Sequence, residues 1–132
     1  MDSAPLVSVL MNCFNGEKYL REAIDSIINQ TYKNWELVFW DNQSTDTSKA
    51  IFDSYQDDRL KYYYAPEHTD LGGGRANAFK YLYGDYIAVL DVDDIWLPTK
   101  LKKQLQLFTC LLYTSDAADD LLCVDLGGRR II

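Results

Sequence analysis

The chain has 132 residues, of which 48% are hydrophobic, and its 13 basic and 20 acidic residues give a formal net charge of −7. This composition fits one compact folded domain and excludes a disordered or collagen-like chain. The acidic balance excludes electrostatic adhesion to nucleic acid or to an anionic membrane surface. No apolar stretch reaches about 18 residues and the N-terminus lacks the pattern of a secretion signal, so we expect a cytoplasmic chain.

Buried-strand patterns alternate with amphipathic-helix patterns along residues 6–108. The first strand is an apolar run that ends in a turn, and the first helix follows it with apolar residues at helical spacing. Strands are predicted over residues 6–11, 35–40, 60–64 and 86–90. Helices are predicted between and after them, over residues 17–29, 47–55, 74–82 and 98–108.

Strands that alternate with helices predict an α/β fold with a mainly parallel sheet and right-handed crossover connections. Ligands bind to such sheets at the carboxyl ends of the strands. We therefore expect the chemistry in the loops that follow Met11, Trp40 and Leu90. Cys13 is interpreted as a small buried thiol, because the three cysteines have neither disulfide nor metal-ligand spacing.

Residues 110–132 show no period that persists long enough to predict an element. Residues 110–119 and 123–132 resemble translated sequencing-library adaptors, in the expected order and one reading frame, and residues 120–122 would encode a sample index. We therefore expect a truncated domain over residues 1–109 and a non-native tail over residues 110–132 that takes no part in the fold. A genuine acidic C-terminal extension is the alternative.

Asp91, Asp93 and Asp94 directly follow the fourth predicted strand. Carboxylates this close together repel one another unless a cation lies between them. Hard divalent cations such as Mg²⁺ and Mn²⁺ bind carboxylate oxygens and complete their shell with phosphates and water. The triplet therefore predicts a site for a cation and a diphosphate. The alternative is an acidic loop in which Asp94 caps the following helix.

Polar and aromatic side chains follow the first two predicted strands. Asp41 and Asn42 come after the second strand, where donors and acceptors can read the edge of a nucleobase or a ribose. An Asx turn or a helix cap explains the same pair and is compatible with such contacts. Asn12 and Phe14 come after the first strand and offer an amide beside a stacking plane, although a turn Asn and a buried Phe explain them as well.

The run Gly72-Gly73-Gly74 precedes Arg75, and a flexible backbone beside a cation suits contact with a phosphate. The spacing matches neither the dinucleotide-binding fingerprint nor a P-loop. His68 is the only histidine of the chain and lies in a polar loop, where it is interpreted as a solvated residue. No hydrolase triad is therefore expected.

Together, residues 7–46 and 71–98 resemble the N-terminal, nucleotide-binding half of the glycosyltransferase family 2 enzymes, which have the GT-A fold. The resemblance covers residues 6–108. It rests on three motifs in the expected order: the turn after the first strand, the acidic loop after the second and the D-x-D after the fourth. It implies a Rossmann-like half domain that binds a nucleotide-diphosphate sugar.

The resemblance also implies roles for individual residues. Contacts to the nucleotide are implied for six of them: Asn12, Phe14, Asp41, Asn42, Arg75 and Asp91. Asp93 and Asp91 would bind the metal ion, Mg²⁺ or Mn²⁺. Family members commonly have Pro-Thr-Tyr at positions 12–14 and Asp at position 42. Because the amide of Asn42 donates as well as accepts, a preference for uracil is left open.

The function implied by the resemblance is that of the donor-binding half of an inverting, metal-dependent glycosyltransferase. A sugar would pass from a nucleotide-diphosphate sugar to a hydroxyl of a saccharide or lipid-linked acceptor, and a carboxylate would take the proton. The half that carries this base is absent, so we expect the 132-residue chain to be inactive. A nucleotide-binding module without catalysis and a metal-dependent nucleotidyltransferase are the alternatives. Attachment of the full-length protein to the cytoplasmic face of a membrane stays open.

Overall fold

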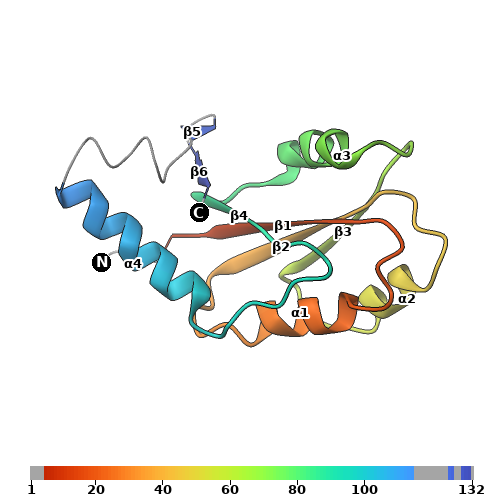
Figure 1. The fold of residues 1–132 in the computed structure, drawn as a ribbon, viewed down its shortest axis with the longest axis horizontal. Helices are drawn as coiled ribbons and strands as arrows, with labels where there is room; N and C mark the ends of the chain where they lie inside the picture. The colour runs from red at the N-terminus through yellow and green to blue at the C-terminus, as the bar shows by residue number, and fades with distance from the viewer. Residues whose placement is uncertain (1–4, 115–124, 127–128, 132) are drawn as a thin grey trace.

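The computed structural model describes residues 5–114, 125–126 and 129–131. Its centre is a sheet with the strand order β3-β2-β1-β4-β6-β5 (Figure 1). Strands β1 to β4 pair in parallel, and β6 pairs in parallel with β4, whereas β5 is antiparallel to β6. The expected α/β fold with a mainly parallel sheet is confirmed. The strands span Val7–Cys13 (β1), Trp35–Asp41 (β2), Leu60–Tyr64 (β3), Tyr86–Val89 (β4), Asp125–Leu126 (β5) and Arg129–Ile131 (β6).

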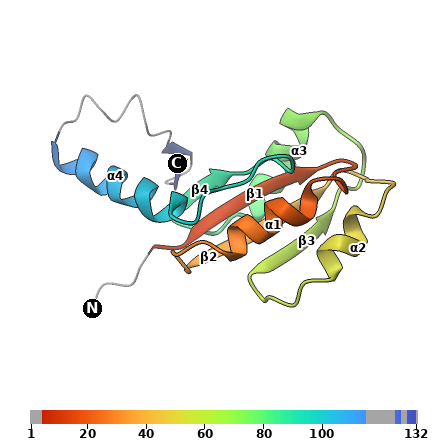
Figure 2. The same ribbon diagram turned by 60° about the horizontal axis from the view of Figure 1, so that its bottom comes forward.

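Helices cover both faces of the sheet, with α1 and α2 on one face and α3 on the other (Figures 1 and 2). Helix α4 joins the α1 face, where Leu101 and Leu105 pack into the core. The helices span Leu20–Ile28 (α1), Ser48–Asp53 (α2), Leu71–Ala78 (α3) and Lys100–Thr114 (α4), and the 3-10 turn η1 spans Phe79–Tyr81. Among the described residues, no helix has the length and apolar character needed to cross a membrane.

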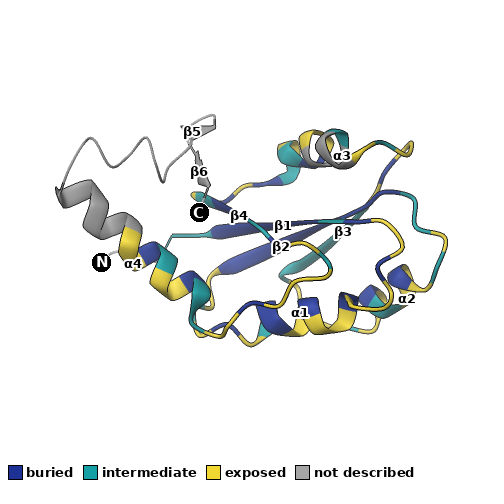
Figure 3. Ribbon diagram, in the orientation of Figure 1, coloured by how far each residue is buried: buried dark blue, intermediate teal, exposed yellow. Residues whose placement is uncertain are grey.

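The central strands are buried on both faces, as their apolar sequences predict (Figure 3). The cluster on the α1 face is built on residues such as Val9 and Leu37, and the cluster on the α3 face on Leu10 and Val38. Cys13 is fully buried in the first cluster, as predicted, and its burial raises the pKa of the thiol. This two-sided packing holds the carboxyl ends of the strands in fixed positions.

Helix α3 begins earlier than the predicted range of residues 74–82. It starts at Leu71 and gives way to η1 at Phe79. Glycine is a poor helix former, so the glycine run indicated a loop. In the structure, the Asp70 carboxylate accepts a hydrogen bond from the Gly73 N–H at 2.7 Å. This bond caps the N-terminus of the helix and offsets the weak propensity.

Helix α4 runs past its predicted end at Phe108 and continues to Thr114. Residues 110–132 carry no period from which an element could be predicted, and the structure places in them the end of α4 and strands β5 and β6. Helical hydrogen bonds are local, and the edge of β4 offers N–H and C=O groups with which an extended segment can pair. Strand pairing of this kind depends on local geometry, and it does not test whether the source gene encodes these residues. The non-native origin of the tail stays a prediction, and residues 115–124 lie outside the described part.

A buried carboxylate ties β1, β2 and β3 together near their amino ends. Glu36 accepts hydrogen bonds from Ser8 Oγ, Lys61 Nζ (2.8 Å) and the Tyr83 N–H (2.9 Å). Burial alone would raise the pKa of Glu36, but these hydrogen bonds outweigh it and hold the pKa below its ordinary value.

Gly84 packs closely against β1. The Gly84 N–H donates to Ser8 Oγ, and a Cβ at Gly84 would lie 2.6 Å from Ser8 N. Only glycine fits at that position.

Candidate functional site

The carboxyl ends of β1 and β2 are joined by a hydrogen bond from the Asn42 N–H to the Cys13 C=O at 2.7 Å. Asp41, the last residue of β2, is 1% exposed. Its carboxylate accepts hydrogen bonds from the Ser44 N–H at 2.8 Å and from the Tyr62 hydroxyl. Burial and the hydrogen bond to Asp41 raise the pKa of Tyr62 well above its ordinary value. Asp41 thus stabilises the turn after β2, in keeping with the interpretation as a turn residue.

Asn42 is 3% exposed, and its side-chain amide pairs with the backbone of Thr69. Nδ2 donates to the Thr69 C=O at 2.6 Å, and Oδ1 accepts from the Thr69 N–H at 3.0 Å. The Asn42 C=O lies 3.1 Å from His68 Nδ1, and because a carbonyl only accepts, we assign the proton to Nδ1. The turn after β2 therefore holds the loop after β3.

A cavity of about 260 Å³ opens beside this connection. Its walls are formed by Asn12, Phe14, Asn42, His68, Thr69 and Asp70. Phe14 is 50% exposed, and the His68 ring packs edge-on against it with the ring centroids 4.6 Å apart. The structure thus brings together three of the predicted site residues. An exposed aromatic ring beside amide groups can hold a flat heteroaromatic ring by stacking and hydrogen bonding.

No sequence pattern indicated that the loop after β3 lines this cavity, to which it contributes His68, Thr69 and Asp70. His68 is exposed, as predicted, but its ring contacts Phe14 and is not simply solvated. The Ala65 N–H donates to the Asp41 C=O at 2.8 Å, which places the start of this loop beside the end of β2. The predicted parallel sheet could have indicated this loop in advance. A loop that follows a third parallel strand also lies at the edge of the sheet where ligands bind.

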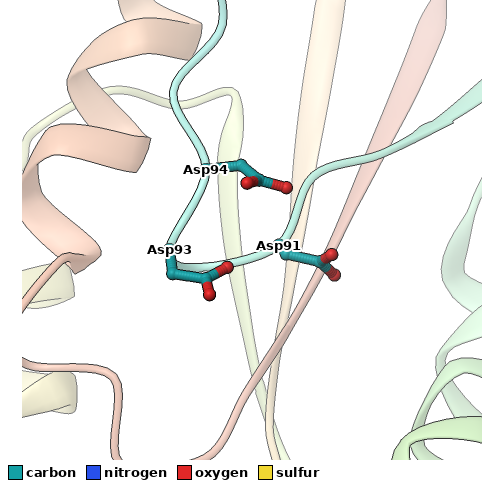
Figure 4. Close-up of side chains that lie close together, drawn as sticks. All are labelled: Asp91, Asp93 and Asp94. Carbon is teal, nitrogen blue, oxygen red and sulfur yellow. The ribbon is translucent and has the colours of Figure 1, made fainter.

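The loop after β4 carries Asp91, Asp93 and Asp94, all exposed, with carboxylate oxygens within 4.8 Å of one another (Figure 4). The Asp94 N–H donates to the Asp91 C=O at 3.0 Å, so the backbone turns tightly here. Clustered carboxylate oxygens fit the ligand preference of Mg²⁺ and Mn²⁺. Helix α4 begins only at Lys100, so the alternative in which Asp94 caps that helix is wrong.

Gly16 joins the turn after β1 to this acidic loop. A Cβ at Gly16 would lie 3.1 Å from Val92 Cγ2 and 3.1 Å from Cys13 Sγ, so the absence of a side chain permits the close approach. The Gly16 N–H also donates to Ser48 Oγ of α2 at 3.0 Å.

Arg75 belongs to α3, but its side chain lies outside the described part, and its contact to a nucleotide stays a prediction.

The family model described as Glycosyl transferase family 2 matches residues 8–110. The chain is 40% identical over 108 residues to the putative glycosyltransferase EpsE of Bacillus subtilis (strain 168), covering 80% of this chain and 39% of that protein. It is 37% identical over 102 residues to the UDP-Glc:alpha-D-GlcNAc-diphosphoundecaprenol beta-1,3-glucosyltransferase WfgD of Escherichia coli, covering 77% of this chain and 40% of that protein. The chain thus spans about two fifths of the length of these curated relatives.

Solved structures share the fold. S. aureus TarS 1-349 in complex with UDP-GlcNAc is 27% identical with a TM-score of 0.74, and the match covers 78% of this chain and 31% of that one. The mannosyltransferase PcManGT from Pyrobaculum calidifontis is 22% identical with a TM-score of 0.73, covering 79% of this chain and 32% of that one. The second likeness is one of fold alone. These matches confirm the expected Rossmann-like α/β fold.

Proposed function

This chain belongs to glycosyl transferase family 2, and we propose that it is the donor-binding half of an inverting enzyme that transfers a sugar from a nucleotide-diphosphate sugar to an acceptor hydroxyl. The observation that carries the proposal is that the polar cavity and the acidic loop lie at the same edge of the sheet. The turn after β1 connects them, because its Phe14 lines the cavity and its Gly16 packs closely against Val92 of the acidic loop. A nucleotide-diphosphate sugar needs both environments, a pocket for the base and a cation for the diphosphate. The relative WfgD is named for UDP-Glc and the TarS structure contains UDP-GlcNAc, which supports such a donor.

We assign the residues that line the cavity to the nucleotide. The exposed ring of Phe14 offers a stacking face, and the amides of Asn12 and Asn42 lie in the same walls. Asp41 would support the nucleotide site by stabilising the turn after β2, because its carboxylate oxygens already accept hydrogen bonds within the protein. Arg75 is assigned to the same ligand from its motif alone.

Asp91 and Asp93 would hold the divalent cation, Mg²⁺ or Mn²⁺, and Asp91 would also face the ribose. When bound, the cation neutralises the negative charge of the departing diphosphate. The chain itself keeps the oxygen donors within 4.8 Å of one another on an exposed loop that a phosphate can approach. The net charge of −7 disfavours an unaccompanied diphosphate, which adds to the need for a cation.

We place the saccharide or lipid-linked acceptor, and the base that takes its proton, outside this chain, which spans about two fifths of its relatives' length. A general base must lie within hydrogen-bond reach of the acceptor hydroxyl. The clustered carboxylates of the described residues are assigned to the metal instead. The 132-residue chain is therefore proposed to bind donor nucleotide without transferring sugar.

Calorimetry with the 132-residue chain tests the proposal. UDP and GDP are titrated with and without Mn²⁺ or Mg²⁺ into the wild type, Asp93→Ala and Glu22→Ala, the last an exposed acid on α1 that serves as the matched control. We expect binding that requires the metal and weakens at least about tenfold in Asp93→Ala only. Equal binding under all conditions would exclude the metal role. The absence of binding under every condition would exclude nucleotide binding by this chain.

A further inference from the structure

Gln30 lies just beyond the end of α1, is fully buried and contacts the segment that leads from the acidic loop into α4. Its Nε2 donates to the Leu97 C=O at 2.7 Å and to a carbonyl in the last turns of α1 at 3.0 Å. Its Oε1 accepts from the Leu101 N–H at 3.1 Å. The next residue, Thr31, donates its N–H to the Pro98 C=O at 2.8 Å. An amide suits this position because it supplies two donors and an acceptor.

These hydrogen bonds cap α4 from the segment that follows α1. The Leu101 N–H lies in the first turn of α4, where backbone N–H groups find no partner within the helix. The Leu97 C=O accepts from the Lys100 N–H at 3.0 Å as well as from Gln30 Nε2. One carbonyl therefore joins the first residue of α4 to Gln30. Gln30 therefore fastens the chain at Leu97 to the end of α1.

The acidic loop is consequently held at both ends. At its start, the Leu90 N–H donates to the Leu10 C=O of β1 at 3.0 Å. At its end, Gln30 holds Leu97, and the Trp96 side chain, 8% exposed, packs into the core. Between these anchors the three carboxylates stay within 4.8 Å of one another against their mutual repulsion. Gln30 and Trp96 thus restrain the end of the loop that carries the three carboxylates.

We propose that Gln30 is a positioning residue for the divalent cation, because it fixes the end of the acidic loop and so keeps the carboxylates within reach of one ion. The inference rests on the metal role proposed above. Gln30 is 67 positions away from its partner Leu97, and its side-chain hydrogen bonds to Ser26, Leu97 and Leu101 involve none of the three aspartates. Partners that hydrogen-bond to metal ligands change the affinity of metal sites by about tenfold or more, and Gln30 would act on the ligands through the backbone of their loop.

Mn²⁺ alone is the probe, since the electron paramagnetic resonance signal of the free ion reports the bound fraction. Wild type, Asp93→Ala, Gln30→Met and Ile27→Val are compared at a temperature where thermal unfolding shows each variant folded. Gln30→Met keeps the length of the side chain and loses its hydrogen bonds, whereas Ile27→Val trims a fully buried side chain of α1 and leaves the anchor intact. We expect the Kd for Mn²⁺ to rise about tenfold or more in Gln30→Met and to stay within about twofold in Ile27→Val.

An unchanged Kd in folded Gln30→Met would overturn the inference and leave the metal role standing. If the wild type binds no Mn²⁺, or Asp93→Ala binds it equally well, the inference fails, and the calorimetry with nucleotide then decides the metal role by itself. Should Gln30→Met not fold, hydrogen exchange of the wild type decides. Because coupling is reciprocal, Mn²⁺ must slow exchange of the Leu101 N–H, and unchanged exchange at saturation would overturn the inference.

Discussion

Asn42 and Thr69 are joined by a reciprocal pair of hydrogen bonds, although 27 positions separate them in the chain. The pair fastens the loop after β3 to the turn after β2, and both residues line the same cavity. Its chemistry requires an amide, since the side chain must donate to a C=O and accept from an N–H. The amide found at position 42, where the family commonly has a carboxylate, therefore has a structural role.

Asn42→Asp should lower the free energy of unfolding by about 1–3 kcal/mol, because a carboxylate has no hydrogen for the Thr69 C=O and would face its oxygen. Urea unfolding followed by tryptophan fluorescence measures the loss. Asn77→Asp makes the same chemical change at an exposed position and should stay within about 0.5 kcal/mol of the wild type. Equal stability of the two variants would contradict the importance of the pair.

Stability should fall at acid pH through Glu36. The pKa of Glu36 in the folded chain lies below its ordinary value of 4.5, so on acidification the unfolded chain binds the proton first and unfolding is favoured. Glu36→Gln should cost about 1.5–3 kcal/mol at pH 7 and should flatten the loss of stability between about pH 5 and pH 3. Urea titrations at each pH test this. Parallel pH profiles for both proteins would refute it.

Gly84→Ala should destabilise the fold by about 1–3 kcal/mol. Its Cβ would lie 2.6 Å from Ser8 N and 2.7 Å from the Leu6 C=O oxygen, and backbone atoms cannot move aside easily. Gly73→Ala is the matched control, because its close neighbours are side-chain atoms and alanine gains helix propensity in α3. Thermal unfolding midpoints compare the two. A Gly84→Ala midpoint as high as that of Gly73→Ala would count against the steric argument.

The tail over residues 110–132 should be absent from the source gene, because its two ends resemble translated adaptors. Independent, adaptor-free reads across the codons of Phe108 and Thr109 decide the matter. A chain that ends at Thr109 should then retain the unfolding midpoint of the 132-residue chain, since β1 to β4 and both core clusters precede that residue. Recovery of the same tail codons in those reads would show that the tail is native.

The 132-residue chain should show no sugar transfer even where it binds nucleotide. The reason is that its clustered carboxylates are assigned to the metal, and a general base must reach the acceptor hydroxyl. Radiolabelled nucleotide sugars incubated with a panel of saccharide and lipid-linked acceptors measure transfer. Acceptor-dependent turnover by the wild type that disappears in Asp93→Ala would overturn this expectation.

The local sequence pattern was enough to predict the central strands and the acidic loop. The apolar runs before Cys13, Asp41 and Leu90 predicted β1, β2 and β4 to within two residues of their observed ends, because strands buried on both faces need continuous apolar residues. The carboxylates of Asp91 and Asp93 could be grouped in advance because they are neighbours in the chain. The glycine-rich start of α3 escaped prediction, since a cap from Asp70 outweighs poor helix propensity there.

Contacts between distant segments depended on the tertiary structure. No period or motif marks the hydrogen bond from Gln30 to Leu97 or the packing of His68 on Phe14. A residue's place in a pattern indicates which face of its own element it occupies, whereas a contact also depends on where the sheet sets two loops side by side. The α/β fold and the clustering of acids after β4 therefore followed from the order of residues along the chain. The packing of helices on the sheet decided which side chains line the cavity and which hold the acidic loop in place.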